Sequence, residues 1–427
     1  MSDDASIIES SGRVERGAVL RMVGYALLLG LVGAVSGLLF LWIVDLGPLW
    51  YGEPGTGWFD GPWWWVAVAT AAGLLVGLIR KRFGMPEEMS GLIEDLQSES
   101  VEPRWVPATV AVSAVSLVGG ASLGPEVALG EIGGGTGGLI ARRRNLGDDD
   151  TKALTLSGMA GAFGGLFSSP LLAIILVTEV AQPERKRYLR VFYGSLIASS
   201  VSLGIYFAIA GSVFLGVYQV PEFQFEDWHL LAGIGLGLVA AFLVLVTAIV
   251  MRATRATFSR VRGPGWMKPV MGGAVFGLIG VALPLTNFTG SDQLQTVLQD
   301  GAKIGVVLLV AILVGKIIAF AVSSSSGFIG GPIFPVLFLG GTAGVIVSLL
   351  APEVPLGLAF TCLLAAVPGS IVPAPFSMVL LTALLAQIGA LQTTPVLIAV
   401  GVSYVTVAAV RRAMERRQTK SPEPAPS

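Results

Sequence analysis

A break in an apolar stretch, at Gly124-Pro125, constrains the fold of this chain more than any other feature. The surrounding segment, Gly119–Gly137, reads GGASLGPEVALGEIGGGTG. Glycine lets the backbone bend and lets a ligand approach closely, and proline fits the first turn of a helix because its missing N–H costs nothing there. The pattern predicts a helix that begins at membrane depth at Pro125. The first N–H groups of this helix and the positive end of its dipole would face a cavity and favour an anion.

A second copy of the break lies at Gly327–Gly344, which reads GFIGGPIFPVLFLGGTAG. Superposing Gly124-Pro125 on Gly331-Pro332 also aligns the downstream glycines, Gly133-Gly134 with Gly340-Gly341 and Gly137 with Gly344. A further pair follows in each half, FSSPLLAIILV and VPAPFSMVLLT, aligned at Pro170 and Pro375. Glycine and proline are common in membrane helices, so a single pair would carry little weight. Matched pairs in both halves predict a transport site between two structural repeats.

Composition places the chain in a membrane. It is 53% hydrophobic and 13% charged over 427 residues, whereas soluble domains carry roughly 25% charged residues. The mean hydropathy is +0.77. A net charge of −1, with no basic stripe between aromatic residues, gives no nucleic-acid signal, and we expect no nucleic-acid partner. One cysteine, Cys362, and one histidine, His229, argue against a Cys–His metal site and Cys–His catalysis. We expect an all-α integral membrane protein that is not an enzyme and has no metal or cofactor.

The apolar segments differ in length. Spanning a bilayer takes about 20 apolar residues, but Val106–Val118 and Pro170–Ala181 are shorter. Together with the two Gly-Pro breaks, these lengths predict tilted and half-membrane helices rather than a simple serpentine bundle. Lys303–Val322 is interpreted as one span, and Asn287–Gly301 before it as a segment without Lys or Arg.

The distribution of positive charge predicts the topology. Basic clusters flank alternate loops, and the intervening loops carry none, so both termini are expected in the cytoplasm of a multi-pass cell-membrane protein surrounded by lipid. The predicted organisation is a cytoplasmic segment (1–17), a transport domain (18–410) and a basic, disordered cytoplasmic tail (411–427). Residues 18–210 and 228–410 form the two halves of the transport domain.

The predicted solute is an anion held by helix N–H groups, hydroxyls and dipoles. A fixed charge at membrane depth is costly, and a fixed cation would hold a passing anion too tightly. The hydroxyls near the breaks are Ser90, Ser122 and Ser323–Ser326. Lys316 is the main cation that could lie at membrane depth, and its position favours structural pairing or snorkelling.

Three acidic residues are candidates for a gate or a proton site: Glu126, Glu131 and Glu179. Intramembrane acids are functional candidates by default. Glu126 follows Pro125, where a carboxylate stabilises the helix dipole, and it could instead occupy the anion position as a protonatable gate. Glu131 lies five residues on, on a different face. Glu179 lies near the cytoplasmic end of its segment and could simply reach the surface.

These motifs resemble those of the CLC family of chloride channels and chloride–proton antiporters. Ser90-Gly91-Leu92-Ile93 is similar to the start of the GSGIP-type motif of that family. The segment 121–125, ASLGP, is similar to its G-(K/R)-E-G-P motif, and the segment 325–335, SSGFIGGPIFP, to its G-x-F-x-P motif. Phe167–Glu179 resembles a family helix that begins Asn-Ala-Pro. The resemblance covers about residues 20–410.

The resemblance implies a fold of two inverted-topology repeats and a homodimer with a pore in each subunit. It also implies chloride, or a similar small anion, as the transported partner. Ser90 would be an inner anion ligand, and Ile333 and Phe334 would offer backbone N–H groups. The anion-binding residues that follow are Ser90, Gly91, Ser122, Leu123, Gly124, Pro125, Gly331, Pro332, Ile333 and Phe334.

Departures from the family pattern bear on mechanism. The gating glutamate falls on Leu123, and the intracellular proton glutamate of the antiporters falls on Val180. The family's last helix, which brings a pore tyrosine, has no clear counterpart because the chain turns basic at Arg411, and Tyr404 does not align with that tyrosine. Passive conduction is therefore the first hypothesis. Proton-coupled antiport with Glu126 as a substitute gate is the second, and secondary transport of another small anion is the third.

Overall fold

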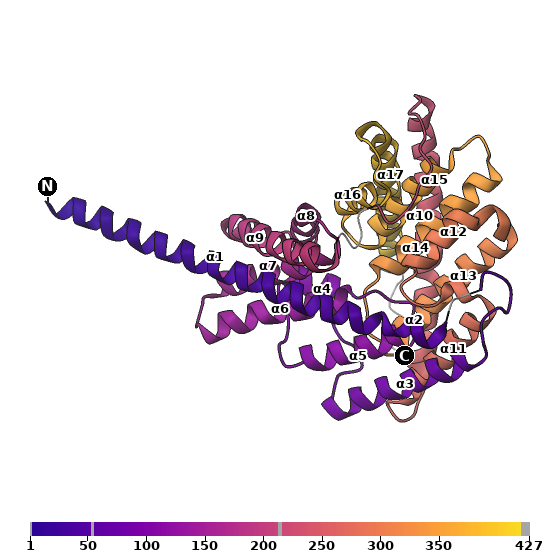
Figure 1. The fold of residues 1–427 in the computed structure, drawn as a ribbon, viewed down its shortest axis with the longest axis horizontal. Coiled ribbons are helices and arrows are strands. Elements are labelled where there is room, and N and C mark those ends of the chain that lie inside the picture. The colour runs from indigo at the N-terminus through magenta and orange to yellow at the C-terminus, as the bar shows by residue number, and fades with distance from the viewer. Residues whose placement is uncertain (1, 53–54, 212–215, 420–427) are drawn as a thin grey trace, which may run out of the picture. The chain divides into compact units, whose positions relative to one another are not determined.

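The computed structural model describes residues 2–52, 55–211 and 216–419, and helices account for most of them (Figure 1). Within these ranges the only β pairing recorded is an isolated bridge between Gly124 and Gly331. The expected all-α class is thus confirmed. The chain forms two contact units, one of residues 1–46, 82–114 and 125–215, the other of residues 47–81, 115–124 and 216–427.

The first unit is built on helices that pack through small residues. It comprises α1 (Ser2–Val44), α4 (Leu92–Ser98), most of α5 (Val106–Val118), α6 (Glu126–Arg143), α7 (Asp148–Leu166), α8 (Pro170–Ala181) and α9 (Arg185–Ala210). A Cβ on Gly133 would overlap the carbonyl of Gly158, and a Cβ on Gly137 would overlap that of Leu154. Glycine at these positions therefore lets α6 and α7 approach backbone to backbone.

The second unit contains the remaining helices. They are α2 (Leu46–Tyr51), α3 (Trp64–Phe83), α10 (Trp228–Arg260), α11 (Met267–Ala282), the 3-10 turn η1 (Pro284–Thr286), α12 (Ser291–Ile304), α13 (Val306–Ser325), α14 (Ile333–Leu350), α15 (Leu356–Ile371), α16 (Pro375–Ala386) and α17 (Ala390–Thr419). Helix α14 packs against α15 as α6 packs against α7. A Cβ on Gly340 would overlap the carbonyl of Leu363, and one on Gly344 would lie 2.5 Å from the Cα of Phe360.

The expected internal repeat is visible as two helix triplets, α6–α7–α8 and α14–α15–α16. Helices α6 and α14 have 18 residues each, and α8 and α16 have 12 each. Both short helices begin at a proline and end at a glutamine in the left-handed conformation, Gln182 (φ 48°) and Gln387 (φ 51°). The glycines that align between the two halves of the sequence are those that allow the close contacts of α6 with α7 and of α14 with α15. The sequence repeat therefore reflects a repeated mode of helix packing.

The membrane assignment agrees with helix length and composition. In the described part of the chain, six helices are long and apolar enough to cross a membrane, and five apolar helices of 10–17 residues are shorter. Val106–Val118 and Pro170–Ala181 have the bounds expected from sequence. A simple serpentine bundle would not contain these short helices.

Two sequence expectations are corrected. Residues 291–304 form helix α12, and α13 starts only at Val306 after Gly305 (φ 81°), so Lys303 belongs to α12 and not to the following span. The disorder expected over 411–427 does not begin at Arg411, because α17 continues as a helix to Thr419. Residues 420–427 lie outside the described part of the chain.

Candidate functional site

The two Gly-Pro breaks are paired through their glycines. In the second unit, the N–H of Gly124 donates to the carbonyl of Gly331 (2.8 Å), and the N–H of Gly331 donates to the carbonyl of Gly124 (2.6 Å). Each glycine directly precedes the proline that caps a helix, Pro125 before α6 and Pro332 before α14. Residues in corresponding positions of the two repeats are therefore hydrogen-bonded to each other.

Two more hydrogen bonds hold the segments around the breaks together. The N–H of Ser122 donates to Oγ of Ser323 (3.2 Å), and the N–H of Ile329 donates to Oγ of Ser116 (3.2 Å). All of these residues lie in the second unit. Of the hydroxyls that the sequence placed near the breaks, that of Ser323 thus accepts a backbone N–H in an apolar setting, where N–H groups need partners, and Ser116 is an additional hydroxyl that the sequence did not indicate.

The donor groups beside this pairing are uncharged. The hydroxyl of Ser122 is fully buried, and within the described part of the chain it has no hydrogen-bond partner. At the start of α14, Val336 already donates its N–H to the carbonyl of Pro332 (3.1 Å), and Pro335 has no N–H. The N–H groups at this helix end therefore belong to Ile333 and Phe334, both buried.

Leu123 places an apolar side chain next to the paired glycines. It is 1% exposed, and a Cβ on Gly330 would lie 2.6 Å from its Cβ. The position that the resemblance gives to a gating glutamate is thus occupied by a tightly packed hydrocarbon side chain. Leucine has no group that can bind a proton or compete with an anion as a carboxylate.

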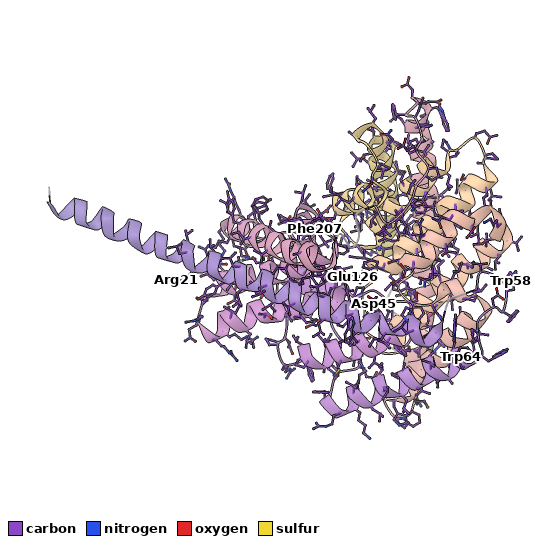
Figure 2. All side chains as sticks on the ribbon, in the orientation of Figure 1. Arg21, Asp45, Trp58, Trp64, Glu126 and Phe207 are labelled. Atoms are coloured by element: carbon purple, nitrogen blue, oxygen red, sulfur yellow. The ribbon has the colours of Figure 1, made fainter. Side chains whose placement is uncertain are left out.

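The start of α6 belongs to the first unit. Pro125 is its N-cap, and Leu129 donates to the carbonyl of Pro125 (3.2 Å), so the preceding N–H groups are those of Glu126, Val127 and Ala128. Glu126, labelled in Figure 2, is the first residue of the helix and is fully buried. A carboxylate at this position interacts favourably with the helix dipole.

Ser90 lies just before α4, also in the first unit. It is exposed, and its hydroxyl hydrogen-bonds the carboxyl group of Asp95. Gly91 is the N-cap of α4, and its N–H donates to Oε2 of Glu94 (3.1 Å). Asp95 was not predicted from the sequence. It lies five positions after Ser90 and on the same short helix as the buried Leu92 and Leu96, and this spacing could have indicated a buried acid near Ser90.

The other two acidic candidates differ in burial. Glu131 is 4% exposed, and its Oε2 has no hydrogen-bond partner among the described residues. Asp95 and Glu102 are its charged neighbours. Glu179 is half-buried in the last turn of α8. Glu131 is thus a buried carboxylate of the first unit, whereas Glu179 lies closer to the surface of that unit.

Lys316 has a structural role in the second unit. Its side chain is fully buried, and Nζ donates to the carbonyls of Thr286 (3.1 Å), Asn287 (3.4 Å) and Phe288 (2.8 Å). It also lies over the ring of Phe338, 5.0 Å from the centroid. The expected structural pairing is confirmed, with backbone carbonyls rather than a carboxylate as partners.

The candidate residues fall into two sets, one in each unit. The first unit holds Ser90, Gly91, Pro125, Glu126, Glu131 and Glu179; the second holds Ser122, Leu123, Gly124, Gly331, Pro332, Ile333 and Phe334. The hydrogen bonds described above bring Gly124 and Gly331 together, with Ser122 and Leu123 on the same segment. Anion binding by these residues, and a site that combines both sets, remain predictions.

Known proteins are similar to this chain both in sequence and in structure. A protein of Escherichia coli (strain SMS-3-5 / SECEC) named "Putative ion-transport protein YfeO" is 27% identical over 348 residues, which cover 78% of this chain and 80% of that protein. The crystal structure of a slow cyanobacterial Cl−/H+ antiporter matches with a TM-score of 0.80 at 19% identity, covering 94% of this chain and 99% of the other. A CLC-type fluoride/proton antiporter matches with a TM-score of 0.73 at 18% identity, covering 90% and 94%.

The structural matches confirm the expected CLC-like fold. The sequence model of one family, described as "Voltage gated chloride channel", matches residues 72–408 and so spans most of the chain. Both break motifs and both helix triplets lie inside that match. The chain belongs to the voltage-gated chloride channel family.

Proposed function

We propose that the chain carries chloride across the cell membrane by passive conduction, through a pore in each subunit of a homodimer. The pairing of Gly124 with Gly331 is the observation that carries this proposal. It fixes the chain just before two helix N-termini, beside the buried hydroxyl of Ser122. Backbone N–H groups and a hydroxyl attract an anion without holding it as tightly as a fixed cation would.

Passive conduction follows from the side chains at two positions. Leu123 replaces the gating glutamate of the family pattern, and Val180 replaces the proton glutamate of the antiporters. Both are buried and apolar. A proton route that used these positions would lack a titratable group at either end. We assign the chain a transport role and not a catalytic one.

Flux from vesicles tests the proposal. The purified chain, reconstituted in liposomes loaded with chloride, should release chloride down its gradient once a potassium ionophore dissipates the membrane potential. An imposed chloride gradient should move no protons uphill. Absence of chloride flux from a folded, monodisperse protein would refute the assignment, and uphill proton movement would refute its passive form.

Proton-coupled exchange is the second candidate function, and Glu126 supports it. A fully buried carboxyl begins α6 three residues after Leu123, and the two solved structures compared above are described as proton antiporters. If uphill proton movement occurs, Glu126→Gln should abolish it while leaving chloride flux. Coupling that survives Glu126→Gln would exclude Glu126 as the substitute gate.

Anion preference, subunit number and orientation complete the proposal. We propose chloride as the anion, with fluoride as the first competitor to test because one similar structure is of a fluoride/proton antiporter. Flux assays with each anion as the only permeant species would rank them. Cross-linking in liposomes should give a dimer, and protease added outside intact cells should leave both termini uncut if they are cytoplasmic.

A further inference from the structure

Two buried carboxylic acids of the first unit are electrostatic neighbours, Asp95 on α4 and Glu131 on α6. Each residue is 4% exposed. Oε2 of Glu131 has no hydrogen-bond partner in the part of the chain that the structure describes. Burying an ionised carboxylate with an unsatisfied oxygen is unfavourable, so burial favours the protonated form of such a group.

Packing of small residues brings these acids together. A Cβ on Gly130 would lie 3.1 Å from Cδ1 of Leu92, and one on Gly134 would lie 2.9 Å from Cγ2 of Val101. Helix α4 and the segment after it therefore lie against α6 at the turns on either side of Glu131. The neighbouring positions of the two acids thus follow from the contact of α4 with α6.

The charged surroundings are acidic. Helix α4 packs against α6 and α8, whose acids are Glu126 and Glu131 on α6 and Glu179 on α8. The charged neighbours are Glu94 for Asp95, and Asp95 and Glu102 for Glu131. The nearby cations have other partners, since Arg104 binds Glu102 and Arg187 binds Glu99. Burial and like-charged neighbours both favour the protonated form of a carboxyl, so this acidic field favours proton binding by the pair.

Ser90 connects this acid pair to the predicted anion ligands. Its hydroxyl hydrogen-bonds the carboxyl group of Asp95. An ionised carboxylate can only accept, so the Ser90 hydroxyl then donates to Asp95. A protonated Asp95 can donate to the Ser90 oxygen, which leaves the hydroxyl hydrogen for another acceptor. Burial raises the pKa of Asp95 to about 6, although the bond from Ser90 lowers it and Glu94 raises it further.

We propose that Asp95 and Glu131 form a proton-binding site that directs the Ser90 hydroxyl either to Asp95 or to the transported anion. Protonation frees the hydroxyl for the anion, so chloride binds more tightly and flux rises on acidification. Glu102, a charged neighbour of Glu131, has a side chain that is 64% exposed, so the pair has an acidic neighbour in contact with solvent. This regulation rests on the anion-transport function proposed above.

Chloride flux from liposomes, measured between pH 4.5 and 8, tests the switch. In the wild-type chain, the chloride concentration that gives half-maximal flux should be about tenfold lower at the acidic end of this range. A tenfold change is the effect of gaining one hydrogen bond to an ion. Asp95→Asn should remove this pH dependence. Glu131→Gln should move its midpoint to lower pH, because the remaining acid loses a repelling neighbour. Glu87→Gln, an exposed acid three residues before Ser90, is the matched control and should keep the wild-type profile.

Infrared spectroscopy of the same protein reports the proton directly. The C=O stretch of a protonated carboxylic acid should disappear as the pH rises, and Asp95→Asn and Glu131→Gln should each alter this signal. Wild-type flux with a pH profile that neither variant changes would overturn the switch and leave the transport function standing. An infrared signal without chloride flux would retain the proton site, but it would overturn both the transport function and the regulation that rests on it.

Discussion

Arg187 binds Glu99 through two parallel hydrogen bonds, from Nε to Oε2 (2.9 Å) and from Nη2 to Oε1 (2.8 Å). The two side chains are 5% and 6% exposed. The same guanidinium also reaches Asp149 on α7, from Nη1 to Oδ1 (3.1 Å). One arginine at the start of α9 therefore joins the loop after α4 to the first turn of α7.

Glu99→Gln should destabilise the first unit. The substitution keeps the shape of the side chain but removes the buried carboxylate of the guanidinium, which keeps only the more exposed Asp149 and Glu184. Breaking a buried pair costs up to about 3–5 kcal/mol. The melting temperature in detergent should fall by several degrees. Asp150→Asn is the matched control, since Asp150 pairs with Arg190 at a half-exposed site, where such pairs contribute little. Equal melting temperatures for the two variants would contradict the role of Arg187.

Asp149 should make stability depend on pH in the acid range. Partial burial would raise its pKa, but hydrogen bonds from Lys186 and Arg187 hold the pKa below its ordinary value of 3.8. A carboxyl whose pKa is lower in the folded state than in the unfolded state contributes stability that is present above pH about 4. This stability is lost as the pH falls through the folded-state pKa. The melting temperature should therefore drop less on acidification in Asp149→Asn than in the wild type.

The control for this pH effect is Asp148→Asn. Asp148 pairs with Lys152 one turn along the same helix, and its side chain is 76% exposed. The pH profile of Asp148→Asn should match that of the wild type. A profile for Asp149→Asn as steep as the wild-type profile would show that the ion pairs of Asp149 do not contribute to acid sensitivity.

Local signals in the sequence predicted the helix ends that depend on local chemistry. Proline at the first position predicted α8 from Pro170 and α16 from Pro375, and the Gly-Pro breaks predicted the starts of α6 and α14 to within one residue. Helix α12 was not predicted, because its polar segment was interpreted only from its lack of basic residues. The amphipathic pattern of that segment indicates a helix.

Side-chain pairs between distant parts of the chain could not be predicted. The basic clusters were interpreted for topology alone and no role was predicted for Asp149, yet Arg187 and Asp149 bind each other. Asp95 was missed because its importance depends on Glu131, which a helix contact brings near. One sequence, without the positions of the helices, gives no measure of such proximity.

Lys316→Met should destabilise the second unit without changing chloride affinity. Methionine retains most of the volume, but three carbonyls lose their shared donor, two of them buried, and each buried unsatisfied group costs about 1–3 kcal/mol. Lys303→Met is the control, because that lysine is 83% exposed and pairs only with Asp300 among the described acids. A large loss of chloride affinity with an unchanged melting temperature would show that Lys316 serves the anion and not the fold.

Gly330→Ala should disrupt the pairing of the two breaks. Its Cβ would lie 2.6 Å from Cβ of Leu123 and 2.9 Å from the carbonyl oxygen of Gly124, and one of these backbone segments must move. Chloride flux per folded protein should fall. Gly235→Ala on α10 has open space around the new Cβ and should preserve flux, with stability unchanged or raised by up to about 1 kcal/mol. Wild-type flux in Gly330→Ala would argue against a role for the paired glycines.

Leu123→Glu should introduce a gate. If Leu123 stands beside the anion path, a carboxylate there competes with chloride when ionised and withdraws when protonated. Flux should therefore be low at neutral pH and should recover on acidification, more steeply than in the wild type. Leu123→Gln has nearly the same shape and cannot ionise, so its flux should lack this added pH dependence. Identical pH profiles for the two variants would place the anion path away from Leu123 and remove the structural basis for passive conduction.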